Sequence, residues 1–329
     1  MFKYILKRIG ISALLLLGVS VILYTLLRCM PTSYVDNLIT SLNQTGADVP
    51  QEMIDTMKKA YGLDGNILQG YLSWAWNVLH FDFGKSFISQ RSVLSEIFSA
   101  DRIGTSFVIA AIATVFEFMI AIPLGVTAAR HQYSLRDYVV TVLVLVGISL
   151  PSFFFGKMLQ SIFALKLGWF PTIGMTTSGL SYSNVFEQWM DSLHHMVLPV
   201  ATVVILSIGG RMRLTRTNML EVLNSDYIRT ARAKGLRESI VIYKHAFRNT
   251  MIPLVTGLAG LIPSLFSGAM ITEQVFGLDG IGGYALKAMT QGDIPVIMTY
   301  NMFLAFLSVT GVLMADLMYG VVDPRVKLA

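Results

Sequence analysis

Residues 9–27 read IGISALLLLGVSVILYTLL, an apolar run without a single charged side chain. A bilayer core of about 30 Å needs about 20 apolar residues at a helical rise of 1.5 Å per residue, so this run can cross a membrane as one helix. Lys3, Lys7 and Arg8 precede it. Arg28 and Met30-Pro31 follow it, in place of the small residues of a signal-peptide cleavage site. We therefore expect the run to be retained as a signal anchor.

The whole chain has the composition of a membrane protein. Of its 329 residues, 54% are hydrophobic and 14% are charged, and the mean hydropathy is +0.61. These values exclude an ordinary soluble domain. The chain has a single cysteine, Cys29, which cannot form an internal disulfide and is expected to act as a small apolar residue.

Five further apolar runs predict an all-α membrane protein with about six transmembrane helices. They cover residues 104–129, 138–165, 196–210, 251–272 and 295–321. Pro151 and Lys157 interrupt the third run, and the fourth is short.

The runs suggest a division of the chain near residue 101. Residues 1–101 are expected to hold the anchor and a small extracytoplasmic cap, which contains the aromatic residues Trp74, Trp76, Phe81 and Phe83. Residues 102–329 are expected to hold five transmembrane helices and a long inner loop, 211–250.

The positive charges predict which side of the membrane each loop faces. With a cytoplasmic N-terminus, six spans place residues 1–8, 130–137, 211–250 and the C-terminal tail inside. These segments hold 16 of the 25 Lys and Arg residues but only five of the 20 acidic residues. The positive-inside rule therefore favours cytoplasmic N- and C-termini.

The inner loop carries the start and stop signals of a short helix. Residues 224–235 read NSDYIRTARAKG, in which Asn or Ser can cap the start and Asp226 lies in the first turn. Lys234 and Gly235 are typical of a helix end.

Residues 236–249 are also compatible with a helix, with Ile240, Tyr243, Lys244 and Phe247 at helical spacing. The two segments predict a helical hairpin that docks a soluble partner. The alternative is a basic loop that binds anionic lipid headgroups.

The chain resembles the permeases of binding-protein-dependent ABC importers, in the dipeptide, oligopeptide and nickel branch, and within it the B-type subunit. The stretches DYIRTARAKGL and KHAFRNTMIPL resemble the cytoplasmic coupling loop of that family. Residues 4–31, the segment YGLDGNILQGYLSWAWNVLHFDFGKSF, the segment TEQVFGLDGIGGYALKAMTQGDIPVI and the terminal VDPRVKL extend the likeness along nearly the whole chain. The resemblance implies a type I ABC importer permease fold.

The resemblance implies a coupling helix that sits in a groove of an ATP-hydrolysing subunit. Its residues are Asp226, Tyr227, Ile228, Arg229, Thr230, Ala231, Arg232, Ala233, Lys234 and Gly235. The family pattern is Glu-Ala-Ala, three residues, then Gly. This chain has Arg229, Thr230 and Ala231 at the first three positions, so only the second Ala and the Gly match.

The resemblance also implies what surrounds the chain. The expected partners are a second, homologous permease, two ATP-binding subunits, an extracytoplasmic substrate-binding protein and membrane lipids, with no nucleic acid. The chain itself would be non-catalytic and without a cofactor, because ATP and Mg are bound by the partner ATPase subunits.

Two acidic residues lie inside apolar runs, where a carboxylate is costly and marks a pathway or a pairing. Glu117 lies near the midplane of the second run. It either lines the translocation path, as an acceptor for the amino end of a peptide, or makes an interhelical hydrogen bond from a protonated carboxyl. Asp316, near the inner end of the last run, is expected to form a structural ion pair.

Three motifs suggest chemistry that their context does not support. Gly84-Lys85-Ser86 ends like a phosphate-binding loop, but the first glycine of that motif is replaced by Leu79. Residues 280–285 fit GxGxxA in letters, without a strand before them. His194-His195 are adjacent, so they do not share a helix face, and no metal site is expected.

Several functions remain open at this point. The leading one is a permease for di- or oligopeptides, and importers of nickel or glutathione share the same motifs. An ion-coupled secondary carrier that uses Glu117 and Asp316 is a further alternative, against which stand the long inner loop and the absence of an inverted repeat. An intramembrane protease ranks last, because no paired-aspartate or serine-histidine motif is found.

Overall fold

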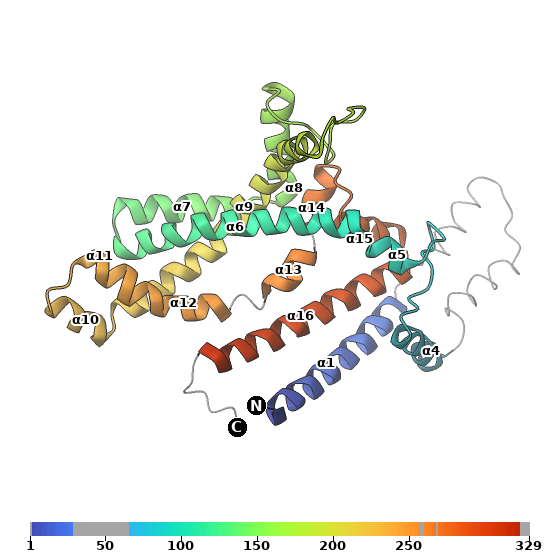
Figure 1. Cartoon of the computed structure of the whole chain (residues 1–329), viewed down its shortest axis with the longest axis horizontal. Helices are drawn as coiled ribbons and strands as arrows, with labels where there is room; N and C mark the ends of the chain where they lie inside the picture. The colour runs from blue at the N-terminus through green and yellow to red at the C-terminus, as the bar shows by residue number, and fades with distance from the viewer. Residues whose placement is uncertain (1, 29–65, 257–259, 268, 323–329) are drawn as a thin grey trace, which may run out of the picture. The chain divides into compact units, whose positions relative to one another are not determined.

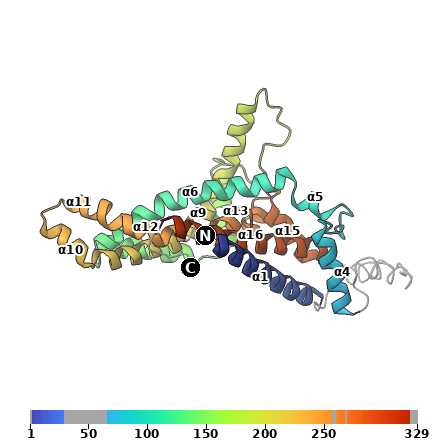
Figure 2. The ribbon, with the colours of Figure 1, turned by 60° about the horizontal axis from the view of Figure 1, so that its bottom comes forward.

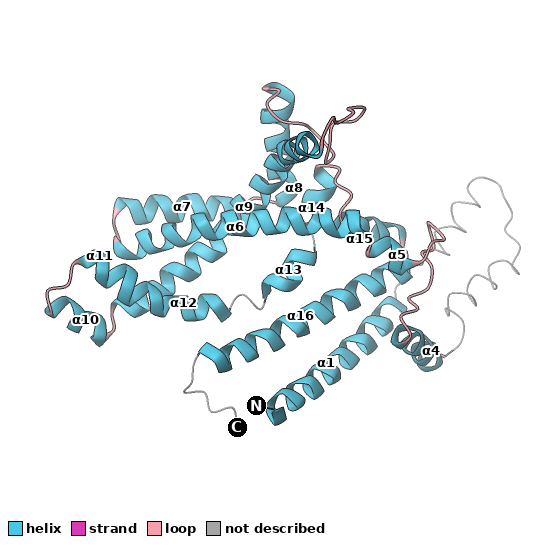
Figure 3. Cartoon of the chain, viewed as in Figure 1, coloured by secondary structure: helices cyan, strands magenta, loops and turns pink. Residues whose placement is uncertain are grey.

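The computed structural model describes residues 2–28, 66–256, 260–267 and 269–322. Helices make up nearly all regular structure in that part of the chain (Figure 3), and its one β feature is an isolated bridge between Lys85 and Ser92. The all-α prediction is confirmed. The chain forms two compact units, a terminal unit of residues 1–104 with 280–329, and a central unit of residues 105–279.

The terminal unit is built on two long apolar helices that lie side by side (Figure 1), α1 and α16. Its helices are α1 (Phe2–Arg28), α4 (Ile67–Leu79), α5 (Val93–Ile97), α15 (Ile281–Gln291) and α16 (Ile294–Val322), together with the start of α6 (Ala100–Arg130). The division expected near residue 101 grouped residues 280–329 with the core. In the structure α15 and α16 belong to the same compact unit as the anchor helix α1, and α16 packs against α1.

The central unit contains the rest of the helices. They are the main part of α6, then α7 (Leu135–Ser149), α8 (Ser152–Leu159), the π-helix η1 (Gln160–Lys166), α9 (Val185–Leu223), α10 (Asp226–Ala233), α11 (Glu238–Ile240), the π-helix η2 (Val241–Ala246), α12 (Phe247–Thr256), α13 (Leu261–Ser267) and α14 (Met270–Val275).

The third apolar run is bent, as its proline predicts. Helix α7 ends at Ser149, and α8 with η1 continues at an angle of 102° to it. Pro151 is the N-cap residue of α8 and has an extended backbone, so it starts a new helix and does not continue the old one.

Helix α9 corrects the expectation of a short fourth span. The expected run covers residues 196–210, whereas the helix extends over 39 residues, Val185–Leu223. It begins early because Asn184 Oδ1 accepts a hydrogen bond from the Glu187 amide at 2.9 Å, while Glu187 Oε2 accepts one from the Ser183 amide at 2.9 Å. Such reciprocal capping starts a helix outside the apolar window that hydropathy detects.

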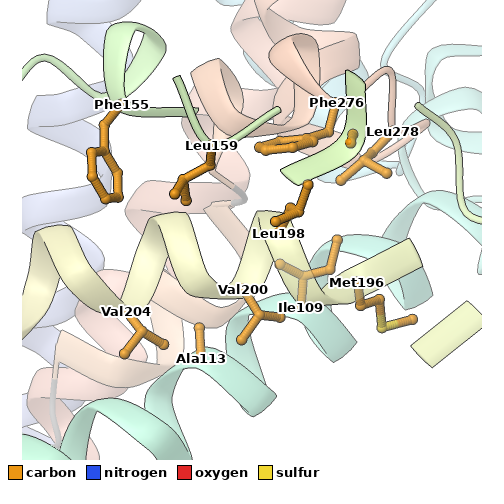
Figure 4. Packing of buried hydrophobic residues seen from close by; sticks show 11 residues of the cluster. Ile109, Ala113, Phe155, Leu159, Met196, Leu198, Val200, Val204, Phe276 and Leu278 are labelled. Carbon is orange, nitrogen blue, oxygen red and sulfur yellow. The ribbon is translucent and has the colours of Figure 1, made fainter. Parts of the chain in front are cut away.

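The core of the central unit lies where α6, α8, α9 and the end of α14 meet (Figure 4). Side chains from α8 and from the segment after α14 cover α9 on one side, and α6 packs on the other. The labelled residues of this cluster are Ile109, Ala113, Phe155, Leu159, Met196, Leu198, Val200, Val204, Phe276 and Leu278.

Four of the described helical segments are long and apolar enough to cross a membrane, and the bent pair of α7 with α8 and η1 makes a fifth. The remaining expected run, 251–272, includes residues 257–259 and 268, which lie outside the described residues, as does most of the expected cap before residue 66. The count of six spans therefore stays a prediction.

Candidate docking site

Helix α10 forms as its sequence signals predict, and it ends in a complete Schellman motif. Gly235 takes a left-handed backbone conformation with φ +75°. Its amide donates to Arg232 O at 2.9 Å, and the Leu236 amide donates to Ala231 O at 3.4 Å. Glycine suits this position because a side chain is disfavoured at positive φ. Ser225 is the N-cap residue, although its hydroxyl donates to Val222 O and caps no amide.

One narrow face of α10 holds it to the rest of the central unit. Ile228 is fully buried and Ala231 is 6% exposed. They pack in one apolar cluster with the ends of α6 and α9 and with η2, through Val126, Ala129, Met219, Val241, Ile242 and Ala246. About 25 cal/mol per Å² of buried apolar surface stabilises such a contact, so these few side chains suffice to seat a two-turn helix.

The other face of α10 is free of contacts with the chain's own core. Eight of the ten residues expected to form the coupling helix are exposed in the structure: Asp226, Tyr227, Arg229, Thr230, Arg232, Ala233, Lys234 and Gly235. Tyr227 is 46% exposed, which is high for an aromatic side chain. Arg229 and Asp226 approach each other at 3.6 Å, but both are well exposed, so this ion pair contributes little.

An ion pair closes the turn between α10 and α11. Arg232 Nη2 donates to Glu238 Oε1 at 2.9 Å, and Arg232 Nε donates to Glu238 Oε2 at 3.3 Å. These hydrogen bonds hold the pKa of Glu238 below its usual range. The pair fixes the second arm of the hairpin relative to the first.

The second arm adds further exposed apolar side chains beside α10. Ile240 is 39% exposed and Tyr243 is 60% exposed, and Leu236 in the turn is 38% exposed. Thr250 anchors the arm, with its buried hydroxyl 3.1 Å from Met219 Sδ in α9. Helices α10 and α11 lie together at one end of the central unit in both Figure 1 and Figure 2. The hairpin thus presents aromatic, aliphatic and basic side chains around a rigidly seated helix.

The structure gives Glu117 a charged partner that the sequence did not reveal. Arg211 Nε donates to Glu117 Oε1 at 3.0 Å, and the two side chains are 15% and 12% exposed. The Arg211 guanidinium also lies 4.3 Å from the centre of the Phe118 ring. An interhelical contact between α6 and α9 is therefore present, with arginine as the donor in place of a protonated carboxyl.

A second arginine of α9 makes a pair of the same kind. Arg216 donates through Nε and Nη2 to the two carboxylate oxygens of Asp137, both at 2.8 Å, and the Asp137 side chain is 5% exposed. This bidentate contact fixes α7 to α9. No local signal predicted it, because the two residues are far apart in sequence.

The remaining sequence candidates have structural partners. His194 Nε2 contacts Trp169 O at 2.8 Å, and His195 Nδ1 contacts Gly174 O at 3.0 Å. The Ser86 hydroxyl donates to Asp293 Oδ2 at 2.6 Å, and residues 280–285 form the N-cap and first turn of α15. The side chain of Asp316 lies outside the described residues.

Comparison with known proteins shows the family to which the chain belongs. Residues 121–328 match the family described as binding-protein-dependent transport system inner membrane component. The chain is 36% identical over 327 residues to the oligopeptide transport system permease protein AppB of Bacillus subtilis, covering 99% of this chain and 100% of that protein. It is 30% identical over 340 residues to the dipeptide transport system permease protein DppB of Alkalihalophilus pseudofirmus, covering 99% and 100%. The chain is therefore a multi-pass membrane protein that belongs to the family of binding-protein-dependent transport system inner membrane components.

Proposed function

We propose that this chain is the permease subunit of an ATP-driven, binding-protein-dependent importer that moves di- or oligopeptides across the cytoplasmic membrane. Support comes from the family match and from full-length likeness to two proteins named for oligopeptide and dipeptide transport. The observation that carries the mechanism is the seating of α10, with Ile228 and Ala231 buried and the rest of the helix exposed.

Residues 226–235 couple ATP hydrolysis to transport in this proposal. Two ATP-binding subunits bind ATP and Mg and receive the exposed face of α10, while this chain is non-catalytic and holds no cofactor. When the ATP-binding subunits close, a helix docked on them moves as a rigid body. The buried contacts of Ile228 and Ala231 then pass the movement to the ends of α6 and α9.

The proposal includes three further partners, and family membership supports them. They are a second, homologous permease, an extracytoplasmic substrate-binding protein and the surrounding lipids. The concentration of Lys and Arg in residues 1–8, 130–137 and 211–250 supports cytoplasmic N- and C-termini, which place the hairpin on the side where ATP is available.

Glu117 stabilises the α6–α9 contact in this proposal and does not bind substrate directly. Its carboxylate accepts a hydrogen bond from Arg211, and both side chains are largely buried. This pairing also disfavours an ion-coupled carrier that would use Glu117 as a free carboxylate.

A co-purification experiment tests the docking surface. The C-terminus is tagged, native membranes are solubilised in mild detergent, and the proteins that co-purify are identified by mass spectrometry. In the Arg229→Glu variant, reversal of an exposed charge on α10 is expected to remove the ATP-binding subunits. The matched control is Arg136→Glu, another exposed arginine, in the first turn of α7, which is expected to retain them.

Two outcomes would contradict the proposal. If the unaltered chain purifies alone or only with itself, the importer assignment is wrong. If both arginine variants retain the ATP-binding subunits, docking does not use the exposed face of α10.

A further inference from the structure

Lys157 places a positive charge on an apolar, bent segment. It lies in α8, which together with α7 and η1 is apolar enough to cross a membrane. Lys157 is exposed and shares one face of the helix with Phe153 and Phe154, which are 56% and 50% exposed. The opposite face, with Phe155 and Leu159, packs into the core (Figure 4). Contact between a charged lysine and lipid acyl chains costs free energy. A lysine on such a face therefore marks a polar path or a paired partner.

The ammonium group is held in place by neutral oxygens. Lys157 Nζ donates to Gln160 Oε1 at 2.9 Å and to Val275 O at 3.4 Å. Among the described residues, no carboxylate lies within ion-pair distance of it. An ammonium has three donor hydrogens, so one is left for a further acceptor, and the positive charge is not neutralised by these contacts.

A buried glutamine positions the lysine. Gln160 is 7% exposed, and its Nε2 donates to the carbonyl oxygen of Thr172. Since only the amide nitrogen can donate to a carbonyl, this bond fixes the orientation of the amide and directs Oε1 to Lys157. The cation is therefore held in one place before any ligand arrives, which lowers the cost of binding.

We propose that Lys157 faces the translocation path and binds the C-terminal carboxylate of a peptide in transit. The inference rests on the proposed function. Every linear peptide with a free C-terminus carries this carboxylate, so one cation serves substrates of any sequence. The single remaining donor gives one charge-assisted hydrogen bond, which binds the carboxylate less tightly than a bidentate contact would.

Chemical modification at this position tests both the location and the charge. Cys29 is the only cysteine of this chain, so a Cys29→Ser background leaves Lys157→Cys as the one thiol of this subunit, and the same vesicles without Lys157→Cys show what the reagents do to the other subunits. Uptake of dialanine, trialanine and tetraalanine is measured in right-side-out vesicles that contain the complete importer. We expect uptake to fall about tenfold in the Lys157→Cys variant, because a hydrogen bond to a charged group is lost.

Aminoethyl methanethiosulfonate then restores a lysine-like ammonium and is expected to restore uptake. The neutral methyl reagent is expected not to restore it. Lys166→Cys is the matched control, because Lys166 is also exposed and lies on the same bent segment. Its loss is expected to leave uptake unchanged. Lys157→Arg, which keeps the charge, is expected to transport at nearly the original rate.

Protection from labelling identifies the ligand group. Without the binding protein, the transported alanine peptide is expected to slow labelling of Lys157→Cys by the aminoethyl reagent, and its C-terminal amide is expected not to. Equal effects of the acid and the amide would overturn the carboxylate assignment. The thiol at position 157 could stay unreactive while the thiol at position 166 reacts. That result would overturn the claim that position 157 faces the translocation path.

Failure of the inference is distinguishable from failure of the proposed function. If the unaltered importer takes up none of the alanine peptides in vesicles, the peptide importer assignment fails. If it takes them up and the neutral reagent restores Lys157→Cys as well as the aminoethyl reagent does, only the assignment of Lys157 fails.

Discussion

Arg211 and Arg216 each bring a guanidinium from α9 to a carboxylate on a neighbouring helix. Removing one partner of a buried pair leaves the other charge without compensation, and this costs more than removing both. Glu117 is 12% exposed and forms an ion pair with Arg211 at 3.0 Å, so it provides a clear test of this cost.

We expect Arg211→Met to lower the free energy of unfolding by about 3 kcal/mol, because the Glu117 carboxylate is then buried and unpaired. The double variant Arg211→Met/Glu117→Met is expected to recover most of this loss. Thermal unfolding of the purified complex in detergent measures both. A double variant as unstable as Arg211→Met alone would show that the two side chains do not interact energetically.

Glu238 makes the turn of the hairpin sensitive to acid. Its pKa is held below the usual 4.5 by the hydrogen bonds from Arg232, so the folded hairpin favours the charged form. The stabilisation is fully present above the unfolded pKa and is lost as the pH falls through the lower, folded pKa. We expect amide hydrogen exchange of residues 236–240 to be unchanged between pH 7 and pH 5, after correction for the intrinsic rate, and to accelerate below about pH 4.5. In Glu238→Gln this acid dependence should vanish, and its persistence would assign the effect to another group.

Two neighbouring helices approach α9 closely at glycines, α6 at Gly125 and α7 at Gly209. A Cβ added at Gly125 in α6 would lie 2.7 Å from Thr215 Cβ and 2.8 Å from the Met212 carbonyl oxygen, both on α9. A Cβ added at Gly209 would lie 2.3 Å from Ile148 Cδ1, 2.4 Å from Ile148 Cγ1 and 2.9 Å from Val144 Cγ1, all of which are side-chain atoms beyond Cβ that can move by rotation about χ1. Thr215 Cβ and the Met212 carbonyl oxygen, which lie opposite Gly125, are fixed to the backbone of α9 and cannot rotate away.

We therefore expect Gly125→Ala to destabilise the protein by about 1–3 kcal/mol, the range for an overpacked contact. Gly209→Ala is expected to cost less. Gly210→Ala meets nothing within 4 Å and should be neutral or stabilising by up to about 1 kcal/mol, because alanine favours a helix. The order of the three melting temperatures checks the prediction, and a Gly125→Ala variant as stable as Gly210→Ala would contradict it.

Local signals predicted α10 well, and hydropathy predicted α9 poorly. Asp226, Lys234 and Gly235 mark their own helix, because capping acts within a few residues. The ends of α9 are polar, so a search for apolar runs finds only its middle. The bend at Pro151 was predictable for the same local reason as α10.

At the scale of the whole molecule, the charge distribution makes a prediction about topology. A reporter that is active only in the periplasm or outside the cell is expected to be inactive when fused after residue 133 or after residue 235, and active when fused after residue 178. The first two positions lie within the inner segments 130–137 and 211–250, and the third lies in the segment between η1 and α9. The reverse pattern of reporter activities would show that the orientation is inverted. The hairpin would then lie on the side of the membrane without ATP.

Long-range pairing is the part of the molecule that the sequence could not predict. Arg211 and Glu117 are 94 positions apart, and Arg216 and Asp137 are 79 apart. Helical periodicity shows which face of a helix is apolar but does not show which helices lie together. The packing of α16 against α1 was not predictable for the same reason, since it depends on tertiary contacts between helices that are far apart in the sequence.

The length of α9 has a consequence for communication across the membrane. Its 39 residues extend about 58 Å along the helical path, nearly twice the hydrocarbon thickness of a bilayer. At its first turns, Asp191 accepts hydrogen bonds from Thr177 and Tyr182 of the preceding segment, and its last turns contact the cluster that seats α10. This single helix, with Pro199 as its one internal proline, is therefore long enough to connect the two surfaces of a membrane. A rotation of α9 at one membrane surface therefore moves its other end directly, because no loop interrupts the helix.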